Sequence, residues 1–168
     1  MQPKEIADII RPSTHKSHDG VIVEGIENCL IKFSRCCSPL PGDDIIGFIT
    51  RGHGVSVHKR DCNNVPRDIS TAEEPERWVR AHWAEVRSES FKATLLINGI
   101  DRNGLLADVT MTIATIGVPV HNVNARQTNG GNCVFTLTIS VQSVEHLRSI
   151  IQRLENVEGV YNVERSNM

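Results

Sequence analysis

The chain has 168 residues, which is enough for one domain or for two small ones. Its 18 basic and 20 acidic residues nearly balance, which excludes a chain held to nucleic acid or membrane by overall charge. Five cysteines, an odd number, argue against a disulfide framework. No signal peptide and no long apolar run are present, so the sequence predicts a cytoplasmic protein without a membrane segment.

Residues 1–20 are predicted to be the last turns of a helix followed by a linker. A short apolar patch at residues 6–10 is stopped by Pro12, and polar residues follow as far as Gly20.

Residues 21–70 have the composition of a small β-rich module. Two short strands are expected first, and two more flank a turn at residues 51–54 that favours a β-hairpin. A module of roughly 45 residues buries too little apolar surface to be stable alone, so it needs a metal, a helix or a partner. The expected strands lie at residues 21–23, 29–33, 45–49 and 55–57.

Three of the cysteines and one histidine are placed to form a cluster. Cys36 and Cys37 precede a turn rich in proline and glycine, and the hairpin returns His58 and Cys62 toward them. Thiolate and imidazole suit Zn²⁺, so these four residues are predicted to hold a structural zinc ion. Adjacent cysteines on a strand point to opposite faces, so both reach one metal only if the chain turns there. The alternative is a set of reduced, partly buried thiols that behave as small hydrophobes.

The run CCSPLPGDDIIGFITRGHGVSVHKRDC, residues 36–62, resembles the zinc-finger-like (RIS) module of a known family. These are the long RelA/SpoT-type (p)ppGpp synthetase/hydrolases, or GTP pyrophosphokinases, of the bacterial stringent response. In that family a C-terminal ACT domain follows the module, and the catalytic domains lie far N-terminal of both. The resemblance implies a non-catalytic C-terminal regulatory region of such an enzyme.

The predicted second hairpin carries a group of basic residues on its loop and exit strand: Arg51, His53, Lys59 and Arg60. On the residues alone, this face either meets phosphates by charge and by glycine amides or is simply solvated. In the resembled family the module touches ribosomal RNA on a ribosome that holds uncharged tRNA. The resemblance therefore favours an RNA-binding face with the ribosome as partner.

Residues 71–89 are interpreted as a linker that ends in a lead-in strand. Residues 71–76 are acidic and contain Pro75, a composition typical of a domain boundary.

Residues 90–168 show apolar spacings that alternate between the repeats of strands and of helices, in the order βαββαβ. This order predicts a ferredoxin-like fold, with one antiparallel sheet and both helices on one of its faces. The whole chain is therefore predicted to be α+β. Strands are expected at residues 91–100, 118–128, 133–141 and 159–164, and helices at residues 104–116 and 144–154.

This second half is similar to ACT domains over residues 91–165. Residues 101–106 stand at the ligand loop of that family, although Asp101 and Asn103 replace the Asn and Pro of its usual Asn-x-Pro-Gly pattern. Free amides at a helix start suit a carboxylate, and Asp101 can equally be a helix cap. A branched-chain amino acid is the expected ligand. The predicted ligand-binding residues are Asp101, Asn103, Gly104, Leu105, Leu106, His121 and Asn124.

A homodimer is predicted through this domain, because strand 91–100 has apolar residues on both faces while the helices cover only one. The sequence contains no catalytic set of a nucleophile with a base, and no phosphate-binding glycine loop followed by Lys-Ser/Thr. The main alternative function is an amino-acid-binding ACT regulatory dimer with no ribosomal role. The 36–62 run argues against it, since such a regulator has no reason to carry this run.

Overall fold

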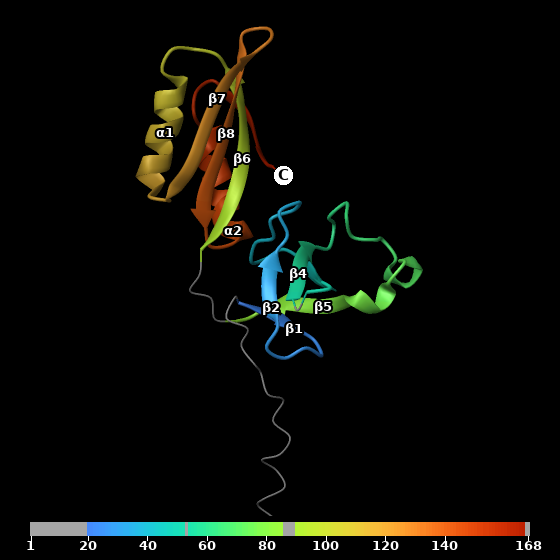
Figure 1. The fold of residues 1–168 in the computed structure, drawn as a ribbon. Helices are drawn as coiled ribbons and strands as arrows, with labels where there is room; N and C mark the ends of the chain where they lie inside the picture. Colours follow the sequence, from blue (N-terminus) through green and yellow to red (C-terminus); the bar gives the residue numbers. More distant parts are fainter. Residues whose placement is uncertain (1–19, 53, 86–89, 167–168) are drawn as a thin grey trace, which may run out of the picture.

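The computed structural model describes residues 20–52, 54–85 and 90–166, and these form two β-sheets with separate apolar cores (Figure 1). In this part of the chain the N-terminal sheet has five strands and the C-terminal sheet has four. This is the expected α+β architecture, a small β-rich module followed by a ferredoxin-like domain. The helix tail predicted upstream of Gly20 lies outside the described residues.

The N-terminal sheet is built around the predicted hairpin. Its strands are β1 (Val21–Val23), β2 (Leu30–Phe33), β3 (Ile45–Ile49), β4 (Gly54–Lys59) and β5 (Trp78–Trp83). β3 and β4 pair antiparallel, β2 pairs with β4 in parallel, and β1 pairs with β5. The order across the sheet is β1-β5-β3-β4-β2, so β1 and β2 lie at opposite edges although they are consecutive in sequence.

β5 comes from the segment that the sequence suggested to be a linker with a lead-in strand. The strand is present, and it lies between β1 and β3 inside the N-terminal sheet. The chain approaches it through two short 3-10 turns, Ile69–Thr71 and Pro75–Arg77. The inward side chains of β5, Val79, Ala81 and Trp83, pack against this sheet's core of Val and Ile residues. Burial of that apolar face explains why β5 joins the first sheet.

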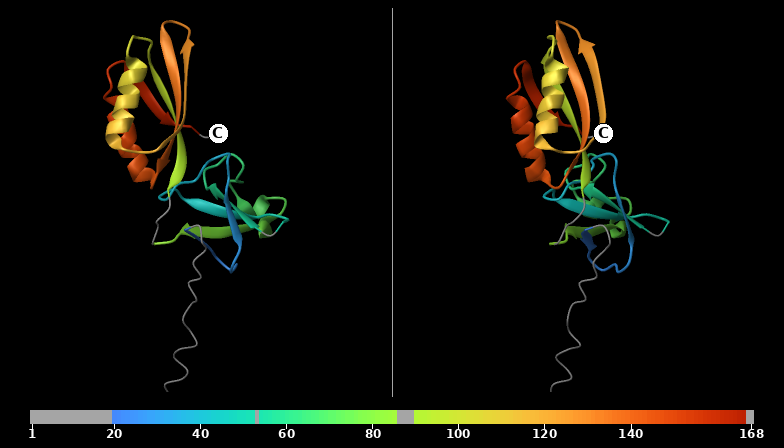
Figure 2. Two further views of the ribbon diagram at one scale, coloured as in Figure 1. Left: turned by 60° about the vertical axis from the view of Figure 1, so that its left-hand side comes forward. Right: turned by 90° about the vertical axis from the view of Figure 1, so that its left-hand side faces the viewer.

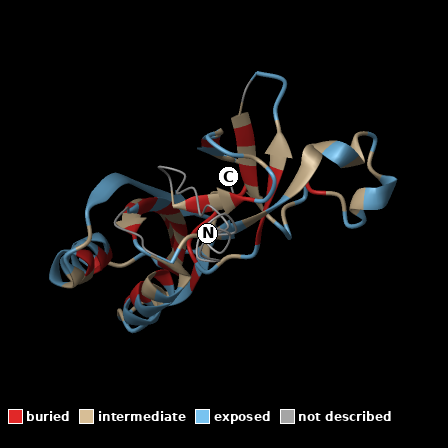
Figure 3. Ribbon diagram, turned by 90° about the horizontal axis from the view of Figure 1, so that it is seen from below, coloured by how far each residue is buried: buried red, intermediate tan, exposed pale blue. Residues whose placement is uncertain are grey.

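The C-terminal half has the predicted βαββαβ order. Its elements are β6 (Phe91–Ile100), α1 (Leu105–Ile116), β7 (Val120–Thr128), β8 (Asn132–Val141), α2 (Val144–Glu155) and β9 (Val160–Arg165). The antiparallel sheet runs β7-β8-β6-β9. Both helices cover the same face of it (Figure 2), and their buried residues face the sheet (Figure 3). No helix in the described ranges is long and apolar enough to cross a membrane.

Local signals at the helix ends explain where the helices begin and end. The Ser143 hydroxyl accepts a hydrogen bond from the His146 amide and caps α2. Gly117 ends α1 with a φ of 81°, a conformation that strains residues with a side chain.

The uncovered face of the C-terminal sheet is mixed rather than uniformly apolar. The hydroxyls of Thr94 and Thr138 lie 3.0 Å apart across it, while Leu96 is partly buried and Ile100 is exposed. At the edge of the sheet, all residues of β7 are exposed.

The two sheets meet at a junction of aromatic residues. Phe33 stacks on Trp83 with ring centroids 5.7 Å apart, and Phe91 meets both rings edge-on at 5.5 and 5.4 Å. Leu40, from the loop between β2 and β3, is fully buried in the core of the C-terminal half. The N-terminal module therefore contributes a side chain to the core of its neighbour.

We expect Gly47→Ala to destabilise the N-terminal sheet. A Cβ at this position would lie 2.7 Å from Cγ1 of Val55 and 3.0 Å from Cγ2 of Val79, both on neighbouring strands. Overpacking of this kind costs about 1–3 kcal/mol of unfolding free energy. Gly52→Ala is the matched control, because a Cβ there meets nothing within 4 Å.

Both tryptophans of the chain lie in β5, so their emission during urea unfolding reports this sheet. Equal unfolding midpoints for the two variants would contradict the packing around Gly47.

Candidate functional site

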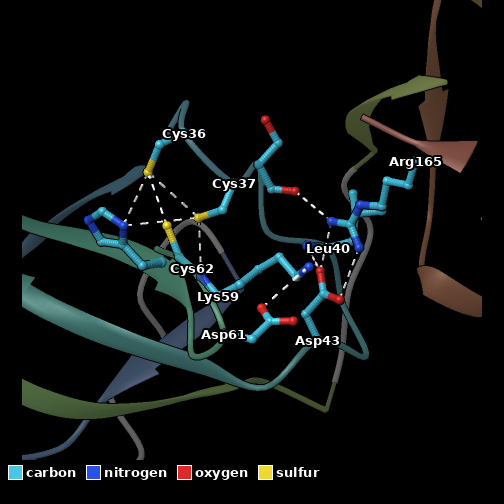
Figure 4. Close-up of polar contacts among 10 residues, drawn as sticks. Cys36, Cys37, Leu40, Asp43, Lys59, Asp61, Cys62 and Arg165 are labelled. Atoms are coloured by element: carbon cyan, nitrogen blue, oxygen red, sulfur yellow. Dashed lines mark hydrogen bonds and ion pairs between the residues drawn. The ribbon is translucent and has the colours of Figure 1, made fainter. Parts of the chain in front are cut away.

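The four predicted ligands converge at the end of β4 (Figure 4). The Cys36 sulfur lies 3.4 Å from the Cys62 sulfur, 3.4 Å from Nδ1 of His58 and 4.0 Å from the Cys37 sulfur. All four ligand atoms lie within 4.8 Å of one another. In a tetrahedral site with metal–sulfur bonds of about 2.3 Å, sulfur atoms lie about 3.8 Å apart. The spacing therefore fits a single metal ion with four protein ligands.

A turn at residues 35–37 solves the problem of two adjacent cysteines that must face one point. The Ser38 amide donates to the Ser34 carbonyl at 2.9 Å, which closes one helix-like turn around the pair. Ser38 then leaves the turn with a φ of 42°, in the left-handed region. The turn directs both thiols toward His58, as metal binding requires.

The other two ligands are fixed by the hairpin. β4 is hydrogen-bonded on both sides, to β2 and β3, so His58 stands on a central strand. Cys62 follows in a turn, where its backbone amide donates to the Lys59 carbonyl at 3.0 Å. The Lys59 amide also donates to the Cys37 sulfur at 3.2 Å, and the Ser34 hydroxyl lies 2.8 Å from the Cys36 sulfur. Such contacts around the ligands orient them and stabilise their charge.

The two adjacent thiols differ in acidity. Burial raises the pKa of the Cys37 thiol to about 12. Burial also raises the pKa of Cys36, but hydrogen bonds, the largest from Ser34, outweigh it and bring that pKa below its ordinary 9.0. Burial lowers the pKa of His58, which keeps its ring neutral and able to bind a metal at pH 7. A metal ion must displace the Cys37 proton, so the affinity of the cluster for a metal ion falls as pH falls.

The predicted RNA-contacting residues are not gathered into one patch. Arg51 lies in the β3–β4 turn with 86% of its side chain exposed, 3.8 Å from Glu74. Lys59 lies at the other end of β4, is 14% exposed and pairs with Asp61 at 3.4 Å. Arg60 is exposed beside it. The fourth residue, His53, lies outside the described residues.

The predicted ligand loop of the second half lines a pocket of about 300 Å³. All of residues 101–106 contribute to it, with Ala125, Arg126 and Gln127 of β7 and Cys133 and Phe135 of β8. His121 and Asn124 are not among the residues that line it. His121 instead lies with Nε2 2.6 Å from the Ser140 hydroxyl.

Asp101 does not cap α1. Its carboxylate accepts a hydrogen bond from the Gln127 side chain at 2.7 Å, across the pocket. The N-cap of α1 is Gly104, with a φ of 83° and no side-chain capping bond. The start of α1 therefore leaves backbone amides uncapped by side chains at the pocket.

Residues missed by sequence reasoning connect the two halves. The guanidinium of Arg165, at the end of β9, binds the Asp43 carboxylate and the Ser38 carbonyl beside the cysteine pair (Figure 4). Arg165 and Asp43 are 122 residues apart, so no local pattern could have linked them.

Comparison with known proteins assigns both halves. Residues 21–84 match the RelA/SpoT RIS domain, and residues 87–165 match the ACT domain. The chain belongs to the RelA/SpoT family. The resemblance drawn from the 36–62 run is thus confirmed, and the RIS match includes β5.

Relatives in several bacteria share this region. The chain is 38% identical over 146 residues to a GTP pyrophosphokinase of Streptomyces coelicolor, an alignment that covers 87% of this chain and 17% of the relative. It is 35% identical over 168 residues to the bifunctional (p)ppGpp synthase/hydrolase RelA of Mycobacterium tuberculosis, with 96% and 22% covered. It thus spans about a fifth of the length of these relatives.

Among solved structures, the ACT domain from GTP pyrophosphokinase of Chlorobium tepidum matches 46% of this chain and 100% of its own, with 27% identity and a TM-score of 0.42.

Proposed function

We propose that this chain is a non-catalytic regulatory region of a cytoplasmic (p)ppGpp synthetase/hydrolase, and that its RIS domain docks on ribosomal RNA. The observation that carries the proposal is the RIS match over residues 21–84, together with the convergence of its four soft ligands at one point. Relatives of this chain are GTP pyrophosphokinases by name, which supports an association with that activity.

In this proposal the cluster holds a structural Zn²⁺. Three thiols and a neutral imidazole are a preferred donor set for zinc, and four protein ligands leave no open position for catalysis. The ion would stabilise a domain whose main apolar cluster, in the part that the structure describes, consists of six buried Val and Ile residues.

We expect Cys37→Ser to lose zinc and to lower the unfolding temperature of the RIS domain, because metal affinity here is folding free energy. Cys29→Ser is the matched control, since Cys29 is partly buried and lies outside the cluster. Elemental analysis of protein purified without chelator should find about one zinc per chain in the parent and in the control. A parent protein that lacks zinc and still has a folded RIS domain would leave the cysteines as ordinary buried thiols.

RNA binding is proposed for the exposed basic ends of β4. Arg51 and Arg60 are exposed, and the six-residue strand between them spans about 17 Å. In this proposal they contact two separate phosphates rather than one. Lys59 is mostly covered and paired with Asp61, so we expect a smaller contribution from it.

Charge reversal tests this surface. Arg51→Glu with Arg60→Glu should weaken sedimentation of the chain with ribosomes and reduce the salt dependence of binding by roughly one unit of slope per lost phosphate contact. Arg126→Glu with Arg153→Glu, two exposed residues of the ACT domain, is the control with the same change of net charge. Binding that is equally strong and equally salt-dependent in all three proteins would refute this surface.

The ACT domain is proposed to pair with a second copy and to bind a branched-chain amino acid. The pocket beside α1 supports the ligand, because amides uncapped by side chains, the Asp101 carboxylate and apolar Leu105 and Leu106 converge there.

The exposed edge strand β7 supports pairing, since an unpaired edge with Val120 and Val123 exposed is a ready surface for a second strand. Pairing at this edge would also bring His121 and Asn124 to the interface. An ACT dimer without a ribosomal role remains the alternative function.

Calorimetry with valine, isoleucine and leucine, together with light scattering, tests the ACT proposal. Binding heat should be lost in Asp101→Ala and retained in Glu145→Ala, an acidic residue in the first turn of the other helix. Light scattering should give twice the mass of one chain. A strict monomer at tens of micromolar would exclude pairing, and no heat with any of the three amino acids at millimolar concentration would exclude the sensor.

A further inference from the structure

One short segment holds two of the clustered cysteines and also contacts the ACT domain through Leu40, Asp43 and the Pro41 carbonyl. We define the cysteine loop as residues 34–43, between β2 and β3. Its first half carries Cys36 and Cys37, and its second half carries Leu40 and Asp43 toward the ACT domain (Figure 4). Cys37 and Leu40 are three residues apart and both are buried. A movement of the cysteine turn would therefore also move the side chain that enters the ACT core.

The central contact is a bidentate ion pair between Arg165 and Asp43. Arg165 donates from Nη1 to Oδ1 at 3.0 Å and from Nη2 to Oδ2 at 2.8 Å, and their side chains are 17% and 10% exposed. Nη2 also donates to the Ser38 carbonyl at 2.8 Å, at the exit of the cysteine turn. The Asp43 carboxylate in turn accepts the Leu40 amide at 2.7 Å. The ion pair therefore holds the shape of the loop as well as joining the domains.

Three further contacts join the same loop to α2 of the ACT domain and to β5 of the RIS domain. The Val144 amide, in the first turn of α2, donates to the Pro41 carbonyl at 2.9 Å and so finds its partner in the RIS domain. Gly42 lies against Val144 so closely that an added Cβ would be 3.3 Å from the Val144 Cβ. On the other side, Nε1 of Trp83 donates to the Asp43 carbonyl at 3.0 Å.

We propose that metal binding by the cysteine cluster and docking of the ACT domain on the RIS domain are thermodynamically coupled through the cysteine loop. This inference rests on the proposed metal site. A bound metal fixes the turn that presents the Ser38 carbonyl to Arg165 and carries Leu40 into the ACT core. Without the metal, the contacts on the cysteine side of that turn are one backbone hydrogen bond and weak thiol contacts, whereas the Arg165 and Asp43 contacts hold its other side. Removal of the metal therefore loosens the domain junction.

Coupling of this kind is reciprocal, which makes it measurable from either side. If the metal strengthens docking by some factor, a variant that weakens docking must lose metal affinity by the same factor. Typical couplings between sites correspond to factors of about 5 to 150.

The first measurement follows the junction while zinc is removed. Trp78 lies near the cluster, edge-on to His58, whereas Trp83 lies in the junction. Trp78→Phe leaves Trp83 as the one tryptophan of the chain. Its emission should shift to longer wavelength on addition of a chelator and return on addition of zinc. An emission spectrum that is unchanged while zinc leaves would overturn the coupling.

The second measurement compares zinc affinity by competition with a chromophoric chelator. Arg165→Ala, which touches no ligand atom, should bind zinc about 5-fold to 150-fold more weakly than the parent. Arg165→Lys should recover part of the loss, and Arg153→Ala, an arginine of the ACT domain away from the loop, should bind as the parent does.

Equal zinc affinity in all four proteins overturns the coupling and leaves the metal site standing. Failure of every protein to bind zinc, including the parent, overturns the metal site and the coupling together.

Discussion

Two neighbouring cysteines that must face one point impose the constraint on which this structure depends. An extended backbone would send Cys36 and Cys37 to opposite sides of a strand. The chain meets the constraint with one helix-like turn, closed by the hydrogen bond from Ser38 to Ser34. Because the turn also sets the direction in which the chain leaves, it determines where Leu40 and Asp43 go. The cluster and the domain junction thus share a single local conformation.

The RIS domain is small, and its stability draws on groups at its margins. Five short strands enclose a core of Val and Ile, and two aromatic residues, Phe33 and Trp83, extend that core to the ACT domain. In a domain of this size, a metal site and a partner surface are the usual supplements to a limited apolar core. The candidate metal cluster and the contacts with the ACT domain both involve the loop between β2 and β3.

The ACT domain, in contrast, has a larger core, to which Leu40 of the RIS domain contributes, and leaves other surfaces free. Its two helices bury one face of the sheet, while β7 and the pocket beside Asp101 stay open. The mixed second face, with its bonded threonine hydroxyls, tolerates water better than a purely apolar face. A partner strand at the β7 edge is therefore a better-supported mode of pairing than sheet-on-sheet packing.

The sequence by itself determined what depends on near neighbours. Apolar periodicity located all the elements of the ACT domain, and alternating strands around a turn located the β3–β4 hairpin, because these rest on contacts within a few residues. Residue types also pointed to the four soft ligands, since few other side chains bind zinc. The family followed from the density of the 36–62 run.

Only the tertiary structure decided how distant segments meet. Strands of three or four residues, such as β1 and β2, carry too little pattern to specify a partner, so burial placed them at opposite edges and inserted β5. Likewise, the sequence grouped Arg51 with Lys59, whereas a full strand separates them. The pairing of Arg165 with Asp43 depends on the docking of two domains, and docking is determined by complementary surfaces rather than by any local repeat.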